Sequence, residues 1–134
     1  MSTEPSLDHL QQFLFDRVTT YEELEILLLL QRKAGQAFSV AGVAKELGAS
    51  TEDCRAALQN LERQGLLTSA EEPPRFRYAP SDSVLAQRVE ELAAAYQDQR
   101  ILVIQMMSRN AVARVRTAAI HTFADAFRLR GPKK

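Results

Sequence analysis

The stretch from residue 39 to residue 67 places the strongest limit on how this chain can fold. Ser39 can cap a short helix over Val40–Leu47, and Gly48 can adopt the left-handed conformation that ends such a helix. Ser50 can cap a second helix that stops at Gly65. The apolar residues of this second helix share one face: Cys54, Ala57, Leu58 and Leu61. Two helices joined by so short a turn form a helix-turn-helix unit.

The residues after this unit predict a β-hairpin. Leu66–Thr68 and Phe76–Tyr78 are short apolar or β-prone runs, and the polar segment 69–74, which contains two prolines, separates them. The order of helix, turn, helix and hairpin resembles the winged helix-turn-helix of bacterial transcription regulators of the MarR and PadR kind. The likeness covers roughly residues 20–80. It implies a DNA-binding transcription regulator.

Further helices are predicted before the motif. Apolar residues at three- and four-residue steps indicate a first helix of about three turns: Leu7, Leu10, Phe13, Leu14 and Val18. Thr20 and Glu23 stand at the spacing of a capping box that opens a helix over Leu24–Ala34. Ile26–Leu30 is apolar on nearly all sides, so this helix should be the most buried one. Residues 36–38 can form a small first strand.

Two long apolar-striped helices are predicted at the end of the chain. Val84–Ser108 contains neither Gly nor Pro, residues 108–110 suggest a break, and Ala111–Arg130 repeats the pattern before Gly131. The winged helix-turn-helix expected before them is complete without these two helices, so their apolar stripes need another surface to cover them. A second copy of the chain in a twofold homodimer would bury them. The alternative is an intramolecular hairpin folded over the first two helices. The expected dimer-interface residues are Leu85, Val89, Leu92, Tyr96, Val103, Met107, Ile120, Phe123 and Phe127.

The predicted fold class is therefore mainly α with a small β-hairpin, a winged helix-turn-helix followed by long C-terminal dimerisation helices. Residues 1–80 would form the winged helix-turn-helix domain with its N-terminal helix. Residues 81–134 would form a helical dimerisation segment with a basic end.

A candidate DNA-reading surface follows from the outer face of the second motif helix and from the hairpin. Arginine and amide side chains can pair with base edges in the major groove, and arginines on a hairpin can contact the phosphate backbone. The candidate residues are Thr51, Arg55, Gln59, Asn60, Arg63, Arg75 and Arg77. Two alternatives remain open. The helix face could be solvated or meet a protein partner, and Glu71 and Glu72 could pair with the hairpin arginines.

The distribution of charge complicates the expectation of DNA binding. Residues 35–80 hold five basic and six acidic side chains, a net charge of −1, whereas DNA-binding surfaces are normally basic. Residues 1–34 carry −3 and residues 81–134 carry +4. The basic end could attract nucleic acid or acidic partners, or could serve solubility and complement the acidic first helices. A winged helix that binds a protein partner and no DNA is therefore the alternative function.

Other function classes find little support in the sequence. No metal-ligand spacing surrounds His9 or His121, and no nucleophile elbow, phosphate loop or zinc-protease motif is present. We therefore expect no enzyme, no metal and no cofactor. The single cysteine, Cys54, lies on an apolar helix face. No apolar run spans a membrane and no secretory signal opens the sequence. A single cysteine cannot form an internal disulfide, so a cytoplasmic location is expected.

Overall fold

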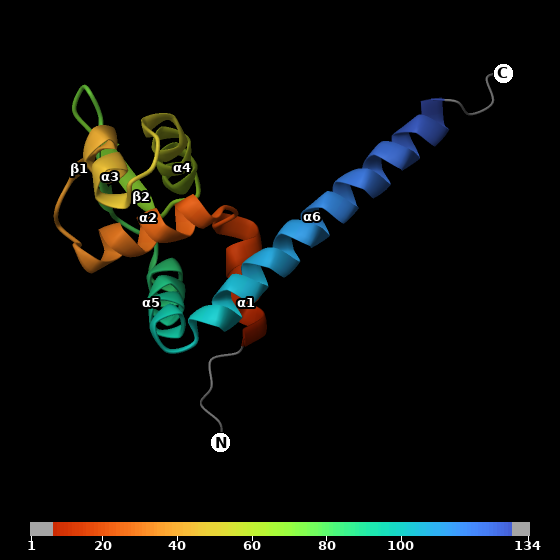
Figure 1. The fold of residues 1–134 in the computed structure, drawn as a ribbon, viewed down its shortest axis with the longest axis horizontal. Coiled ribbons are helices and arrows are strands. Elements are labelled where there is room, and N and C mark those ends of the chain that lie inside the picture. Colours follow the sequence, from red (N-terminus) through yellow and green to blue (C-terminus); the bar gives the residue numbers. More distant parts are fainter. Residues whose placement is uncertain (1–6, 130–134) are drawn as a thin grey trace.

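The computed structural model describes residues 7–129, with side chains over 8–124. It is mainly helical, with a small antiparallel sheet and one long helix that projects from the body (Figure 1). In chain order the elements are α1 (Leu7–Arg17), α2 (Tyr21–Arg32), β1 (Phe38–Ser39), α3 (Val40–Leu47), α4 (Thr51–Arg63), β2 (Leu67–Ala70), β3 (Arg75–Tyr78), α5 (Ser83–Asp98) and α6 (Arg100–Leu129).

The predicted helix caps are confirmed. The hydroxyl of Ser39 accepts a hydrogen bond from the Gly42 amide at 3.0 Å, and that of Ser50 accepts one from the Asp53 amide at 3.0 Å. Gly48 ends α3 with φ of 68°, in the left-handed region that favours glycine. These caps fix the turn between α3 and α4, and hence the direction in which α4 leaves it.

Replacing Ser50 with Ala should lower the free energy of unfolding by about 1 kcal/mol, because the Asp53 amide loses its acceptor at the start of α4. Urea denaturation checks this value, and Ser50→Asp, which keeps an acceptor, should restore most of it. A loss shared by both variants would mean that the cap is not the cause.

The small sheet has the strand order β1-β3-β2, with both pairs antiparallel. Phe76 in β3 is buried, whereas Arg75 and Arg77 on either side of it are exposed, so the two arginines share the outer face as their spacing predicted. Thr68 of β2 is paired with Arg77. The hairpin thus presents two cations on its solvent face.

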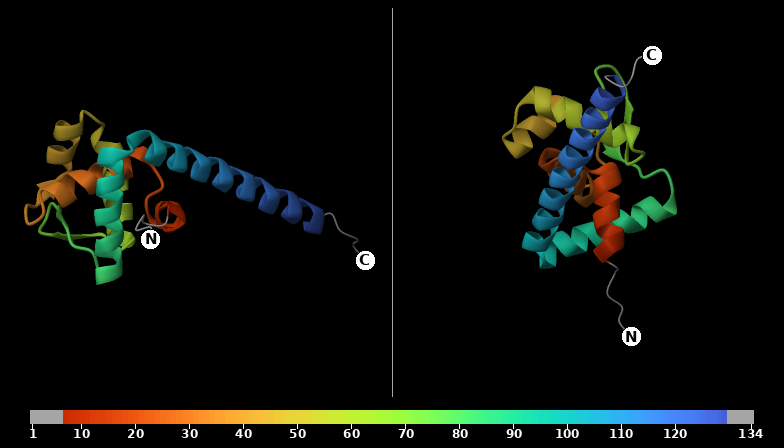
Figure 2. Two further views of the ribbon diagram at one scale, coloured as in Figure 1. Left: turned by 90° about the horizontal axis from the view of Figure 1, so that it is seen from below. Right: turned by 90° about the vertical axis from the view of Figure 1, so that its right-hand side faces the viewer.

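One hydrophobic core joins the motif to the rest of the chain. The apolar side chains of α2 from Leu24 to Leu30 are buried, as the sequence predicted for this helix. Buried residues of α4 pack with them, since α2 and α4 lie against each other. α1 packs against α5 and α6, so the N-terminal helix lies next to the C-terminal helices (Figure 2).

The predicted break at residues 108–110 is wrong, because the chain leaves the helical conformation at Gln99 instead. α6 then runs without interruption for 30 residues, about 45 Å at 1.5 Å per residue. Asn110 lies inside α6 and is buried against α1. Its Nδ2 donates to the Gln11 carbonyl at 3.2 Å, and its Oδ1 accepts from Gln11 Nε2 at 3.3 Å. Asn110, which suggested the end of a helix, is therefore an interior residue of α6 that joins this helix to α1.

The stripe that was expected to form one dimer interface divides into two parts. Leu85, Val89, Leu92 and Val103 are buried in the core of the single chain. They are therefore already covered in the way the intramolecular alternative expected, which corrects the assignment of these four to a dimer interface. Tyr96 and Met107 are partly buried and pack beside these four residues. The other part is exposed, at Ile120 and Phe123, and the side chain of Phe127 lies outside the described residues.

The second half of α6 extends away from the body (Figures 1 and 2). Arg114 contacts α1, where its Nη2 donates to the Phe15 carbonyl at 3.0 Å and its guanidinium lies 4.8 Å from the Phe15 ring centre. Every described side chain from residue 115 to residue 124 is exposed. Within the described part of the chain, no helix is long and apolar enough to cross a membrane.

Candidate nucleic-acid interface

The outer face of α4 carries most of the residues that the sequence placed there. Cys54, Leu58 and Leu61 point into the core, so the residues between them face outward. Exposed side chains on α4 include Thr51, Arg55, Gln59 and Arg63. Their donors and acceptors are of the kind that can pair with base edges.

Asn60 differs from its neighbours because both ends of its amide are occupied within the protein. Its Nδ2 donates to Oε2 of Glu23 at 3.0 Å, and its Oδ1 accepts from Nη1 of Arg63 at 2.7 Å. The side chain is partly buried between α2 and α4. It is therefore not displayed on the outer face in the manner expected for a base contact.

Arg75 and Arg77 of the hairpin lie beside the motif and do not pair with Glu71 or Glu72. Arg75 Nη2 donates to the Ala37 carbonyl at 3.2 Å, and Arg77 is exposed. Among the side chains of residues 8–124, the one ion pair within 4 Å joins Arg88 and Glu91 at 3.2 Å. The pairing of these arginines with Glu71 and Glu72 is thus not formed here.

The two ends of α4 differ in charge. Near its N-terminus, Glu22 and Asp53 help to line a hollow of about 210 Å³ between α2 and α4. Burial raises the pKa of the Cys54 thiol, and the negative charges of Asp53 and Glu22 raise it further. The other end carries Arg63 next to Glu62, so its two charges balance. The carboxylates at the N-terminal edge of α4 would therefore repel anionic phosphates more than its C-terminal end would.

The C-terminal end of α4 is also held from outside the motif. Arg17 of α1 donates from Nη1 to the carbonyl of Gln64 at 2.7 Å. A cation there satisfies a carbonyl that has no partner within the helix, and it complements the negative end of the helix dipole. The sequence offered only one sign of this contact, the basic residue in the last turn of α1.

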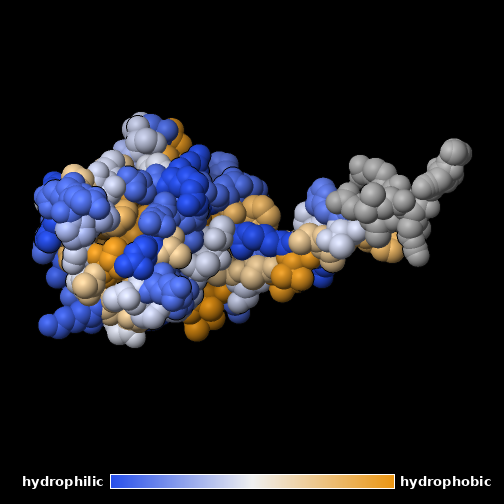
Figure 3. Space-filling model, turned by 90° about the horizontal axis from the view of Figure 1, so that it is seen from above, coloured by the Kyte–Doolittle hydropathy of each residue, from blue (hydrophilic) through white to orange (hydrophobic). Residues whose placement is uncertain are grey.

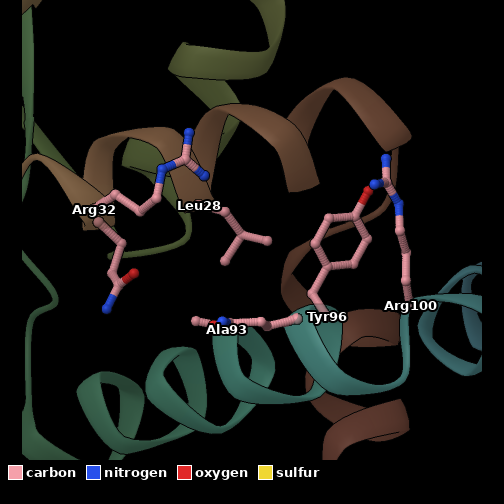
Figure 4. A pocket seen from close by; sticks show the side chains of 7 residues that line it. Leu28, Arg32, Ala93, Tyr96 and Arg100 are labelled. Carbon is pink, nitrogen blue, oxygen red and sulfur yellow. The ribbon is translucent and has the colours of Figure 1, made fainter.

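A second hollow lies between α2 and α5, where the motif meets the C-terminal helices (Figure 4). Its volume is about 530 Å³, with Leu28 and Ala93 on its apolar wall and Arg32 and Arg100 at its rim. The Tyr96 hydroxyl donates to Glu25 Oε2 at 2.8 Å. Burial raises the pKa of Tyr96, and its hydrogen bonds with Tyr21 and Glu25, together with the negative charge of Glu25, raise it further.

The described residues contain no cluster of three or more His, Cys, Asp or Glu side chains arranged to hold a metal ion.

The chain matches no protein family model and no curated protein sequence. It does resemble solved structures. A mutant of MepR from S. aureus bound to an oligodeoxyribonucleotide is 14% identical, with a TM-score of 0.52 over 90% of this chain and 88% of that one. The homodimeric winged helix-turn-helix DNA-binding domain of Mb0332 from Mycobacterium bovis, a possible ArsR-family transcriptional regulator, is 19% identical. Its TM-score is 0.50 over 74% of this chain and 93% of that domain.

The fold is a winged helix-turn-helix. α3 and α4 form the helix-turn-helix, β2 and β3 form the wing, and a long C-terminal helix follows. The predicted fold class is confirmed at this level. The narrower likeness to MarR and PadR regulators stays a prediction, because similarities at these identities establish the fold alone.

Proposed function

We propose that the protein is a DNA-binding transcription regulator that acts in the cytoplasm as a homodimer. The observation that carries this proposal is the arrangement of α4 and the wing. α4 is anchored at both ends and turns Arg55, Gln59 and Arg63 outward, while Arg75 and Arg77 stand on the adjacent wing. The resemblance to a regulator solved with an oligodeoxyribonucleotide supports it.

In this proposal α4 contacts the bases and the wing contacts the phosphate backbone. Thr51, Arg55, Gln59 and Arg63 face the major groove, where arginine and amide side chains discriminate between bases. Arg75 and Arg77 contact phosphates, which position the protein without reading sequence. Asn60 has a supporting role, because its amide is occupied by Glu23 and Arg63.

The homodimer would be formed by the arm stripe, which we define as five exposed apolar residues of α6 from Val112 onward: Val112, Val115, Ala119, Ile120 and Phe123. Apolar side chains are exposed along this part of the molecule (Figure 3). An exposed apolar stripe on a projecting helix is a surface that a second copy can cover. To bind two half-sites, such a dimer has to present its two α4 helices to successive major grooves, about 34 Å apart. The division into two domains at residue 80 stays a prediction.

Binding to genomic DNA fragments at two salt concentrations tests the function. A dimer whose arginines contact phosphates should bind more weakly as salt rises, because each neutralised phosphate releases counterions. Replacing Arg75 and Arg77 together with Gln should make the salt dependence of the dimer shallower by about four units of slope, because each of its two subunits loses two phosphate contacts. Absence of binding to any fragment at low salt would remove the proposal.

A protein-interaction function is the second candidate, and the acidic N-terminal edge of α4 favours it. Glu52 is exposed at this edge, and Asp53 lines the hollow beside Glu22. Such a surface would repel phosphates but could meet a basic protein partner.

The double variant Glu52→Gln/Asp53→Asn separates the two functions. A DNA reader should bind severalfold more tightly once two repelling charges are gone, in the range expected for about 1 kcal/mol of charge interaction. The affinity is measured by fluorescence anisotropy at fixed salt. Ala56→Ser, a neutral exposed change on the same helix, is the control. Unchanged DNA affinity in the double variant would instead favour a surface that faces a protein.

A further inference from the structure

Glu23 is a buried carboxylate that faces the candidate reading helix. Its side chain is only 5% exposed, in the first turn of α2. Its Oε1 accepts hydrogen bonds from the Thr19 amide at 2.7 Å and from the Thr19 hydroxyl at 3.2 Å, and its Oε2 accepts from Asn60 Nδ2 at 3.0 Å. Burying a carboxylate costs free energy that these hydrogen bonds offset. The two hydrogen bonds with Thr19 are enough for a role of Glu23 at the start of α2. The hydrogen bond with Asn60 of α4 therefore indicates a second role.

The carboxylate determines which way round the Asn60 amide lies. An ionised carboxylate only accepts hydrogen bonds, so the NH₂ group of Asn60 must face Glu23. The Asn60 carbonyl then faces the opposite way, toward the surface, where it accepts from Arg63 Nη1 at 2.7 Å. Glu23, Asn60 and Arg63 therefore form a chain of hydrogen bonds from the inside of α2 to the outer face of α4.

We propose that Glu23 is a positioning residue for DNA recognition, which acts through Asn60 to hold the Arg63 guanidinium in place. This inference rests on the proposed function. An exposed arginine loses side-chain entropy when it binds, and a side chain already held in place loses less. The structure thus gives Asn60 an indirect part in recognition, as the residue that orients an arginine.

The variant Glu23→Gln tests the chain of hydrogen bonds with little change of shape. The introduced amide can still accept from Thr19 through its oxygen, but its NH₂ group then faces the NH₂ group of Asn60. Two donors cannot bond, so the Asn60 amide should turn round and present its NH₂ group to Arg63. Arg63 then loses its acceptor. Adding Asn60→Asp to Glu23→Gln supplies a group that accepts from both neighbours, so the double variant should restore the position of Arg63.

The expected DNA affinities of the single and combined variants can be compared with one another. Arg63→Ala should weaken DNA binding by about tenfold, the lower part of the range for a side chain that reads a base. Glu23→Gln should weaken it severalfold, add nothing further on the Arg63→Ala background, and be rescued by Asn60→Asp. The matched control is Glu22→Gln, which removes the same charge from the neighbouring, exposed position of α2. Glu22→Gln should bind DNA as tightly as the wild type or more tightly.

Hydrogen exchange of the Arg63 guanidinium, measured by NMR on the free protein, gives a readout that needs no DNA. Exchange should be slower in the wild type and in Glu23→Gln/Asn60→Asp than in Glu23→Gln. If Glu23→Gln does not fold, Asn60→Ala should show the same faster exchange.

Two results would overturn the inference: unchanged Arg63 exchange in both variants, or a Glu23→Gln affinity loss that persists in full on the Arg63→Ala background. Failure of the wild type to bind any DNA would instead remove the proposed function, and the exchange data would still decide whether Glu23 holds Arg63.

Discussion

Leu92→Ala should lower the free energy of unfolding by about 2–5 kcal/mol, the range observed when a buried leucine is truncated and leaves a cavity. Leu92 lies on α5 and is 0% exposed in the single chain, where α5 packs against α1, α2 and α6. No partner chain is needed to bury it. The variant should therefore lose the same stability at every protein concentration, and its state of association should match that of the wild type.

Urea denaturation at several protein concentrations measures the first quantity, and sedimentation velocity measures the second. Val84→Ala is the matched control, because Val84 lies near the start of the same helix but is 58% exposed. Its effect should stay within about 0.5 kcal/mol. If Leu92→Ala instead dissociated a dimer and left the stability of the single chain unchanged, the assignment of Leu92 to the intramolecular core would be wrong.

The motif could be predicted from the sequence because local signals fix it. Ser39, Ser50 and Gly48 act within three or four residues of their own positions, so their roles are visible in the sequence. The same holds for the buried face of α4 and for the alternation of Arg75 and Arg77, since both follow from a fixed side-chain period.

The features that sequence reasoning missed depend on contacts between distant residues. Nothing near Gln99 marks it as a helix end, since neither Gly nor Pro is close by. Asn110 suggested a break, because asparagine disfavours helix interiors, but its contact with Gln11 lies 99 residues away in the sequence. Glu23 was recognised as part of a helix cap, whereas its contact with Asn60 spans 37 residues. The division of the apolar stripe is of the same kind, because only the packed helices show which part the chain itself covers.

The arm stripe is where the largest effect on function is expected. The double variant Val115→Gln/Ile120→Gln removes two apolar side chains that are 69% and 62% exposed, and it changes neither the charge nor the helix propensity of α6 substantially. In a dimer formed through this stripe, both side chains would be buried, and each would contribute about 1.5–3 kcal/mol through the apolar area removed from water. The double variant should therefore be a monomer at concentrations where the wild type is a dimer.

Loss of the dimer should weaken binding to a two-half-site DNA by about a hundredfold or more, because the second α4 no longer benefits from being linked to the first. Binding to a single half-site should change little, since α4 and the wing are untouched. Sedimentation velocity and anisotropy on both DNAs measure these quantities. Ile101→Gln, an exposed apolar position at the start of α6 beside the body, is the control and should alter neither. A double variant that remains dimeric would show that the arm stripe is not the interface, and a monomer that retains full affinity for the two-half-site DNA would show that pairing of α4 helices is not how the protein binds.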